Sequence, residues 1–179
     1  MTDEVRLPNP LKAISNLPPG SAVIYRHYGV VDRAGFGLTV SKLTRDLGHL
    51  FLVAGDRQLA YELDADGTHM PEALSFRLED GEPFRRADGT KGFNTVAAHS
   101  ADALDRAANM GVDAALLSPI FATQSHPGKD TLGSARGNAM ARQAALPVYA
   151  LGGISEETAQ SLEEGAFCGI AAIGALTKP

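Results

Sequence analysis

The chain has 179 residues, which suffices for one domain with a substantial core, so we expect a single domain over residues 1–179. It is 44% hydrophobic and 21% charged, and its net charge of -5 argues against nucleic acid or an anionic membrane as the main partner. No apolar run approaches the roughly 18 residues of a membrane helix, and no signal peptide opens the chain. We therefore expect a cytoplasmic protein.

Seven short apolar runs predict buried strands. Most of them are continuous runs rather than alternating patterns, which is typical of a parallel sheet covered on both faces. In chain order the predicted strands cover residues 21–26, 50–55, 67–70, 94–99, 114–121, 147–153 and 169–175.

Helical patterns lie between these strands. The clearest cover residues 100–111, with Ser100 as N-cap, and 155–167, with Ser155 as N-cap. Weaker patterns cover 39–48 and 56–64. The polar segment 75–92, which includes Arg85 and Arg86, is expected on the surface as a solvated loop.

The lone cysteine and one histidine have simple expected placements. Cys168 is the only cysteine, so it cannot form an internal disulfide, and a reducing compartment fits. Because its neighbours are apolar, we expect a small core residue, with a functional thiol as the alternative. His49 is expected on the surface at a helix end.

Alternating strands and helices fit a (β/α) barrel or a doubly wound sheet. A doubly wound sheet usually has a glycine-rich turn after its first strand, and "RHYGVVDRAGFG" is no such turn. The small residues follow the last two strands instead, where barrels bind phosphate. Gly152-Gly153 and Gly174-Ala175 are therefore predicted to form a phosphate cradle. The alternative is that Gly153 only makes a tight turn and the small residues only pack.

Five motifs resemble the thiamine-phosphate synthase and thiazole tautomerase superfamily. They are "ADGTHM" (65–70), "VAAHS" (96–100), "SPIFAT" (118–123), "PVYALGGI" (147–154) and "GIAAIGAL" (169–176). The resemblance implies a compact (β/α)₈ barrel, a phosphorylated small-molecule ligand and a homo-oligomer. In the synthases it also implies the joining of a pyrimidine pyrophosphate to a thiazole phosphate, with Mg²⁺.

The pyrophosphate half of the family's site is incomplete in this sequence. Arg26 matches the family's arginine, but His27 and Tyr28 replace its acid and lysine. Gly55 replaces an asparagine that would hold pyrophosphate. The metal-binding aspartate is missing, and Glu72 is the only nearby carboxylate. The resemblance therefore makes Mg²⁺ an uncertain cofactor, and no residue is assigned as its ligand.

The thiazole-phosphate half is better preserved. Thr123 and Ser125 match the family's motif after the sixth strand, although His126 replaces its lysine. The glycine pair Gly152-Gly153 also matches, whereas Gly174 replaces a serine. The tautomerases use a histidine in the sixth strand for proton transfer, and this chain has none there.

Three of the histidines join Arg26 as candidates for catalysis. Two of them lie at the carboxyl ends of predicted strands and one lies in the loop after a strand, where a barrel has its active-site mouth, and histidine can move protons near neutral pH. Metal binding and structural hydrogen bonding remain open for each of them. Arg26 suits a bidentate phosphate contact, with a salt bridge to Asp56 or Asp66 as the alternative. The candidate histidines are His69, His99 and His126; His27 also follows a strand.

Three functions fit these residues. The first is a thiamine-phosphate-synthase-like enzyme acting on a phosphorylated small molecule. The second is a non-catalytic binding or regulatory protein that keeps the phosphate cradle. The third is a tautomerase or isomerase that uses one of the candidate histidines.

The resemblance also predicts a seven-stranded barrel. Thr2-Asp3 correspond to the "T-D" that ends the family's first strand, and the apolar residues that would precede them are not in this sequence. We therefore expect seven strands, with a gap between "AVIYR" (22–26) and "GIAAI" (169–173). The N-terminal residues, water or another subunit would fill this gap.

Overall fold

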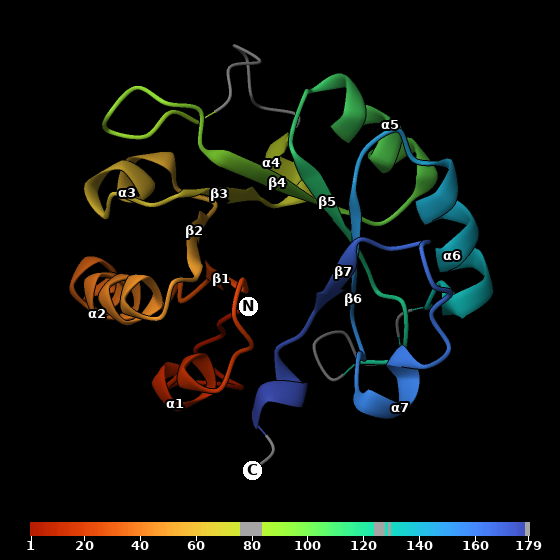
Figure 1. Cartoon of the computed structure of the whole chain (residues 1–179), viewed down its shortest axis with the longest axis horizontal. Coiled ribbons are helices and arrows are strands. Elements are labelled where there is room, and N and C mark those ends of the chain that lie inside the picture. Colours follow the sequence, from red (N-terminus) through yellow and green to blue (C-terminus); the bar gives the residue numbers. More distant parts are fainter. Residues whose placement is uncertain (76–83, 124–127, 129, 178–179) are drawn as a thin grey trace.

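The computed structural model describes residues 1–75, 84–123, 128 and 130–177. Its centre is one parallel sheet of seven strands, in which each strand pairs with its neighbours in the sequence, in the order β1 to β7. The sheet curls into an incomplete barrel with helices around its outside (Figure 1). The predicted parallel β/α architecture and the seven strands are both confirmed.

The strands are β1 Ala22–Tyr25, β2 Leu50–Ala54, β3 Gly67–Met70, β4 Phe93–Ala98, β5 Ala114–Leu117, β6 Val148–Leu151 and β7 Gly169–Ala171. The helices are α1 Leu11–Ser15, α2 Arg33–Asp46, α3 Arg57–Glu62, α4 Glu72–Ser75, α5 Ala101–Asn109, α6 Gly133–Gln143, α7 Glu156–Ala159 and the 3₁₀-helix η1 Gly174–Thr177. No helix in these described segments is long and apolar enough to cross a membrane.

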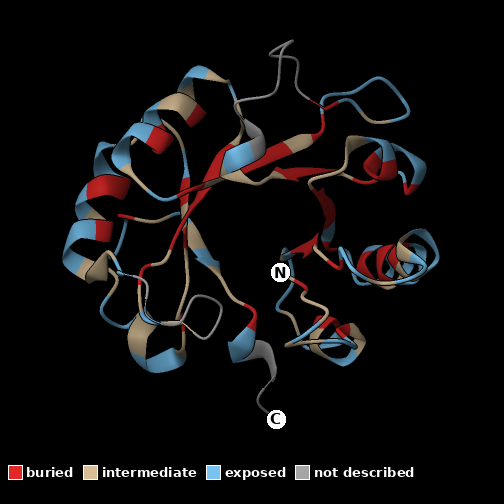
Figure 2. Cartoon of the chain, turned by 180° about the vertical axis from the view of Figure 1, so that it is seen from behind, coloured by how far each residue is buried: buried red, intermediate tan, exposed pale blue. Residues whose placement is uncertain are grey.

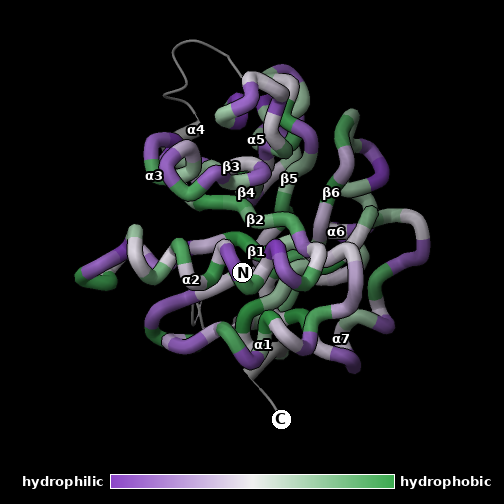
Figure 3. The backbone as a smooth tube through the Cα atoms, turned by 60° about the vertical axis from the view of Figure 1, so that its left-hand side comes forward, coloured by the Kyte–Doolittle hydropathy of each residue, from purple (hydrophilic) through white to green (hydrophobic). Residues whose placement is uncertain are grey.

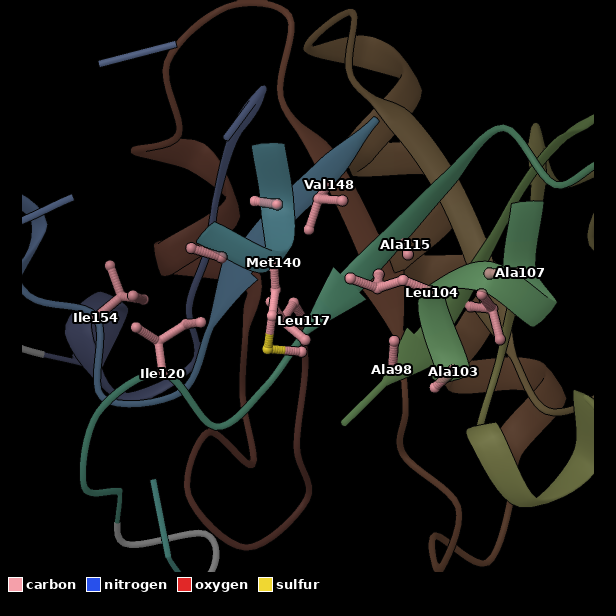
Figure 4. Packing of buried hydrophobic residues seen from close by; sticks show 13 residues of the cluster. Ala98, Ala103, Leu104, Ala107, Ala115, Leu117, Ile120, Met140, Val148 and Ile154 are labelled. Atoms are coloured by element: carbon pink, nitrogen blue, oxygen red, sulfur yellow. The ribbon is translucent and has the colours of Figure 1, made fainter. Parts of the chain in front are cut away.

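Two apolar clusters join the outer face of the sheet to the helices. One is centred on Leu104 and Met140, which pack α5 and α6 against β4 to β6 (Figure 4). The other is centred on Phe51 and Val40, which pack α2 against β1 and β2. Buried residues are concentrated in the strands and on the inward faces of these helices (Figure 2). The chain is mostly hydrophobic along the central strands (Figure 3).

A third, smaller cluster fills the inside of the curl. Ile24, Leu52 and Leu116 from three different strands are buried there, together with Ala54. Since side chains alternate between the two faces of a strand, these residues define which positions face inward. The residues that follow the strands in the same register therefore line the interior near the carboxyl ends.

The N-terminal residues bridge the open side of the sheet. The Thr2 N–H donates to Ile24 O at 2.9 Å, and the Met1 nitrogen donates to Ala172 O at 2.9 Å. These bonds reach from β1 to the residue after β7, although no strand lies between them in the described sheet. The predicted gap is confirmed, and the first two residues occupy part of it.

Several element boundaries differ from the predictions. The strand predicted over 114–121 ends at Leu117, and the helix predicted over 155–167 ends at Ala159. Ser155 does cap that helix, but none of the residues of α7 is fully buried, so tertiary packing supports only a short helix. Helix α6 was not predicted at all, because "GSARGNAMARQ" contains two glycines and few large apolar residues.

Two placements predicted from the sequence are wrong. Cys168 is exposed; it directly precedes the edge strand β7, in which Ile170 is 56% exposed. His49 is 6% exposed, so it lies in the core. Arg85 is exposed and Arg86 is partly exposed, as expected for a surface loop, and Arg86 also forms an ion pair with Asp66 at 3.2 Å. Most of the remaining polar segment, residues 76–83, lies outside the described residues.

Candidate functional site

Arg26 lies at the carboxyl end of β1 and faces the interior of the curl. It follows Ile24 in register, and its positive charge contributes to lowering the pKa of the buried His69. Within the described part of the chain, its guanidinium makes no ion pair and no hydrogen bond. A partly buried cation without a counter-charge favours the binding of an anion.

The two carboxylates considered as alternative partners of Arg26 pair with other arginines. Asp56 accepts from Arg33 Nη1 at 3.1 Å and caps α3 by accepting from the Leu59 N–H. Asp66 forms the ion pair with Arg86. The salt bridges considered for Arg26 are therefore not formed.

His69 is buried inside the curl and is held by its neighbours. Its Nδ1 lies 2.9 Å from Thr95 Oγ1, and the Thr95 hydroxyl donates to Thr68 O at 3.4 Å. Thr95 therefore accepts the proton of Nδ1, which leaves Nε2 as an acceptor. Burial, and then the charge of Arg26, lower the pKa of His69 to about 3. At neutral pH His69 is uncharged and can orient a ligand by hydrogen bonding.

His27 lies on the outer face of the sheet. It is fully buried, with its ring stacked on Tyr25 at a centroid distance of 5.6 Å. Its Nδ1 lies 2.9 Å from Thr2 Oγ1, and its Nε2 lies 3.3 Å from Pro8 O. Both ring nitrogens are engaged, so His27 has a structural position away from the mouth.

His99 is the candidate histidine at the mouth. Its Nδ1 lies 2.6 Å from Ser118 O, a pure acceptor, so Nδ1 carries the proton and Nε2 keeps a lone pair. The Nε2 atom lies 3.9 Å from Glu72 Oε2, and the side chain is 52% exposed. Glu72 also pairs with Arg106 at 3.2 Å. A half-exposed imidazole in a fixed tautomer can accept a proton from a bound ligand.

The glycine pair after β6 packs closely against the loop after β5. Gly152 has φ +95° and Gly153 has φ +64°, values that side chains other than glycine rarely adopt. A Cβ on Gly153 would lie 2.4 Å from Ala122 O. Loop packing alone therefore requires glycine here. The Gly153 N–H has no hydrogen-bond partner among the described residues, so this packing leaves a backbone donor for a ligand.

The second wall of the predicted cradle follows β7. Gly174 begins η1, it is exposed, and a Cβ on it would meet nothing within 4 Å. Ala175 is exposed as well. Thr123, from the loop after β5, is half-buried. Ser125 and His126 lie outside the described residues. The predicted cradle thus has Gly174 and Ala175 as accessible positions on one side.

The carboxylates that the structure describes do not fit a protein-held Mg²⁺. Magnesium prefers several oxygen ligands in octahedral geometry. Glu72 is already paired with Arg106, and Asp56 with Arg33. The described residues contain no group of three or more His, Cys, Asp or Glu side chains that could hold a metal ion. We therefore derive no chemical step through Mg²⁺.

Comparison with known proteins identifies the class of barrel that this geometry represents. The curled parallel sheet overlays on a thiamine phosphate pyrophosphorylase from Pyrococcus furiosus with a TM-score of 0.71 at 22% identity, covering 92% of this chain and 77% of that one. The family model for thiamine monophosphate synthase matches residues 18–176. The chain therefore belongs to the thiamine monophosphate synthase family.

Curated relatives agree with this assignment. The chain is 34% identical over 136 residues to putative thiamine-phosphate synthase 2 of Aquifex aeolicus, and the alignment covers 75% of this chain and 69% of that protein. It is 30% identical over 150 residues to the thiamine-phosphate synthase of Geobacillus thermodenitrificans, covering 81% of this chain and 64% of that protein. The aligned part of the chain thus spans about two thirds of the length of these relatives.

Two polar groups that position site residues near the mouth could not be identified from the sequence. The Ser118 carbonyl fixes the tautomer of His99, and the Thr2 hydroxyl contacts the residues that follow β1. A backbone carbonyl leaves no signal in residue type. Thr2 was noted only as the end of a missing strand, and its two contacts depend on the long-range closure of the sheet.

Proposed function

We propose that this protein binds a phosphorylated heterocycle of thiamine biosynthesis at the carboxyl ends of its strands and carries out the family's coupling reaction. The phosphate of a thiazole phosphate would bind between Gly152-Gly153 and Gly174-Ala175, with Thr123 beside it. The observation that carries the proposal is the interior Arg26, which has no counter-charge among the described residues. Family membership names the chemistry for which such a cation is needed.

In this reaction the bond between the pyrimidine methylene carbon and the pyrophosphate oxygen breaks, and pyrophosphate leaves with the electron pair. The thiazole nitrogen then donates its lone pair to the pyrimidine cation. Arg26 would stabilise the negative charge on the departing pyrophosphate. The neutral His69, beside Arg26, would orient a ligand through Nε2 without adding charge.

A second candidate function rests on His99. Its fixed tautomer leaves Nε2 unprotonated at the mouth, and Glu72 lies close enough to stabilise the imidazolium that forms when Nε2 takes a proton. This arrangement supports proton transfer on a phosphorylated ligand, as a tautomerase or isomerase would require. A non-catalytic phosphate-binding protein would use the same cradle without either reaction.

One assay separates these functions. Purified protein is incubated with thiazole phosphate and pyrimidine pyrophosphate, with and without Mg²⁺, and thiamine phosphate is measured. The coupling function predicts thiamine phosphate above the uncatalysed background, and a large loss in Arg26→Gln but not in the surface variant Arg136→Gln. No product, together with measurable binding of thiazole phosphate, would contradict coupling; exchange of ligand protons lost in His99→Gln would then support proton transfer.

A further inference from the structure

Thr2 joins the N-terminal residues to the end of β1 where Arg26 begins. The side chain is 2% exposed, although it lies one residue from the start of the sequence. Its N–H donates to Ile24 O at 2.9 Å. Its Oγ1 accepts from the Arg26 N–H at 2.8 Å and lies 2.9 Å from His27 Nδ1. Thr2 thus contacts three residues around the carboxyl end of this strand: Ile24, Arg26 and His27.

The direction of the hydroxyl bond follows from the other nitrogen of His27. Nε2 faces Pro8 O at 3.3 Å, and a carbonyl can only accept, so Nε2 carries the proton. Nδ1 is then an acceptor, and the Thr2 hydroxyl donates to it. The hydroxyl therefore acts in both directions: it accepts from the Arg26 backbone and donates to a buried ring. Valine, which has the same shape, could do neither.

This contact lies where the sheet lacks a neighbour for β1. In the described sheet β1 pairs only with β2, so its other edge is held by the N-terminal residues rather than by a strand. The Met1 nitrogen reaches Ala172 O at 2.9 Å, next to the turn that holds Gly174. Residues 1–2 therefore connect the Arg26 side of the mouth to the β7 side.

We propose that Thr2 is a positioning residue that fixes the backbone of Arg26, so that its guanidinium faces the anion site inside the curl. The proposal rests on the proposed function, because Arg26 must bind an anion for its position to matter. Thr2 itself touches no ligand: it acts through the Arg26 N–H and through the ring of His27. The connection across the open edge replaces the restraint that a paired strand would supply.

A double-mutant cycle tests this role, with inorganic pyrophosphate as the probe and calorimetry as the measurement. The variants are Thr2→Val, Thr2→Ser, Arg26→Gln and the double variant Thr2→Val/Arg26→Gln. Losing the hydroxyl bonds should weaken pyrophosphate binding about fivefold in Thr2→Val. Thr2→Ser keeps the hydroxyl and should stay within about twofold of the unmodified protein. In the Arg26→Gln background, Thr2→Val should cause no further loss, because its effect passes through Arg26.

The outcomes separate this inference from the proposed function. Equal affinity of the unmodified protein and Arg26→Gln would contradict the anion site itself, before any Thr2 variant is made. If Arg26→Gln binds pyrophosphate weakly and Thr2→Val binds it as tightly as the unmodified protein, the positioning role alone would be overturned. Equal losses from Thr2→Val in both backgrounds would show a merely structural effect, and would overturn it as well. If Thr2→Val does not fold, the ¹⁵N shifts of the His27 ring in the unmodified protein show which ring nitrogen carries the proton. A proton on Nδ1 would contradict the hydrogen bond assigned to the Thr2 hydroxyl and overturn the proposal.

Discussion

The two sides of the mouth differ in whether their polar groups already have hydrogen-bond or ion-pair partners within the protein. On the β1–β3 side, nearly every charged group that could meet a ligand has a local partner: Asp56 holds Arg33, and Glu72 holds Arg106. Among the described residues of this side, Arg26 is the exception. On the β6–β7 side the Gly153 N–H has no partner among the described residues, and its loop is tightly packed, whereas Gly174 is exposed and a Cβ on it would meet nothing within 4 Å. A ligand phosphate would therefore meet one guanidinium on the first side and backbone donors on the second.

The largest expected effect is on the β6–β7 side. Gly153→Ala should lower the free energy of unfolding by about 3 kcal/mol, since the new Cβ combines a left-handed backbone with a clash against Ala122 O. Gly165→Ala is the matched control: Gly165 also has positive φ, +76°, but a Cβ there meets nothing within 4 Å. It should cost only about 1 kcal/mol. Equal losses in urea denaturation would show that the packing of the glycine pair is unimportant.

The next largest effect is on the β1 side. Arg26→Gln should weaken pyrophosphate binding at least about tenfold, because a charge-assisted hydrogen bond to the anion is lost. Its melting temperature should not fall, since no described partner of the guanidinium is left behind. The control is Arg136→Gln, an exposed arginine on α6 without a described partner, which should bind as before. Similar affinity of the two variants in calorimetry would remove Arg26 from the site.

A smaller effect is expected from pH. His69 has a folded-state pKa of about 3 against 6.5 when unfolded, so between these values the unfolded chain binds the proton and the folded chain does not. The free energy of unfolding is therefore unaffected by His69 well above pH 6.5, and it decreases as the pH falls below that value. At pH 5 the loss is about 2 kcal/mol.

The matched variant for this effect is His69→Gln, which cannot titrate. Its free energy of unfolding, measured by urea denaturation at pH 7.5 and pH 5, should change less between the two pH values than that of the unmodified protein. An equal change in both proteins would mean that His69 is solvated or charged in the folded state.

The strands could be predicted because continuous apolar runs such as "LFLVA" mark a sheet covered on both faces. The resemblance of the motifs to a known family then predicted the barrel and the gap between its first and last strands. Helix α6 and the shortness of α7 could not be predicted from local pattern, because α6 packs through small residues and α7 has no fully buried residue. The exposure of Cys168 could not be predicted either, because its apolar neighbours do not show that it precedes the edge strand β7.

The candidate site was predicted in part. Its location at the strand ends follows from the barrel, and Arg26 was identified by its place in a motif. That Arg26 has no counter-charge among the described residues could not be predicted, because Asp56 and Asp66 pair with Arg33 and Arg86 through contacts between segments far apart in the sequence. For the same reason the sequence could not show that His69 is buried while His99 stays accessible.

The most direct test of the central claim is an NMR titration of ¹⁵N-labelled protein with thiazole phosphate, with inorganic phosphate as a second probe. The anion site predicts saturable shifts of the backbone amides of Gly153, Gly174 and Ala175 with both probes, because the phosphate group is common to them. Gly165, a glycine outside the site, should not shift. Shifts that spare all three amides, or no saturable change up to millimolar ligand, would contradict the account.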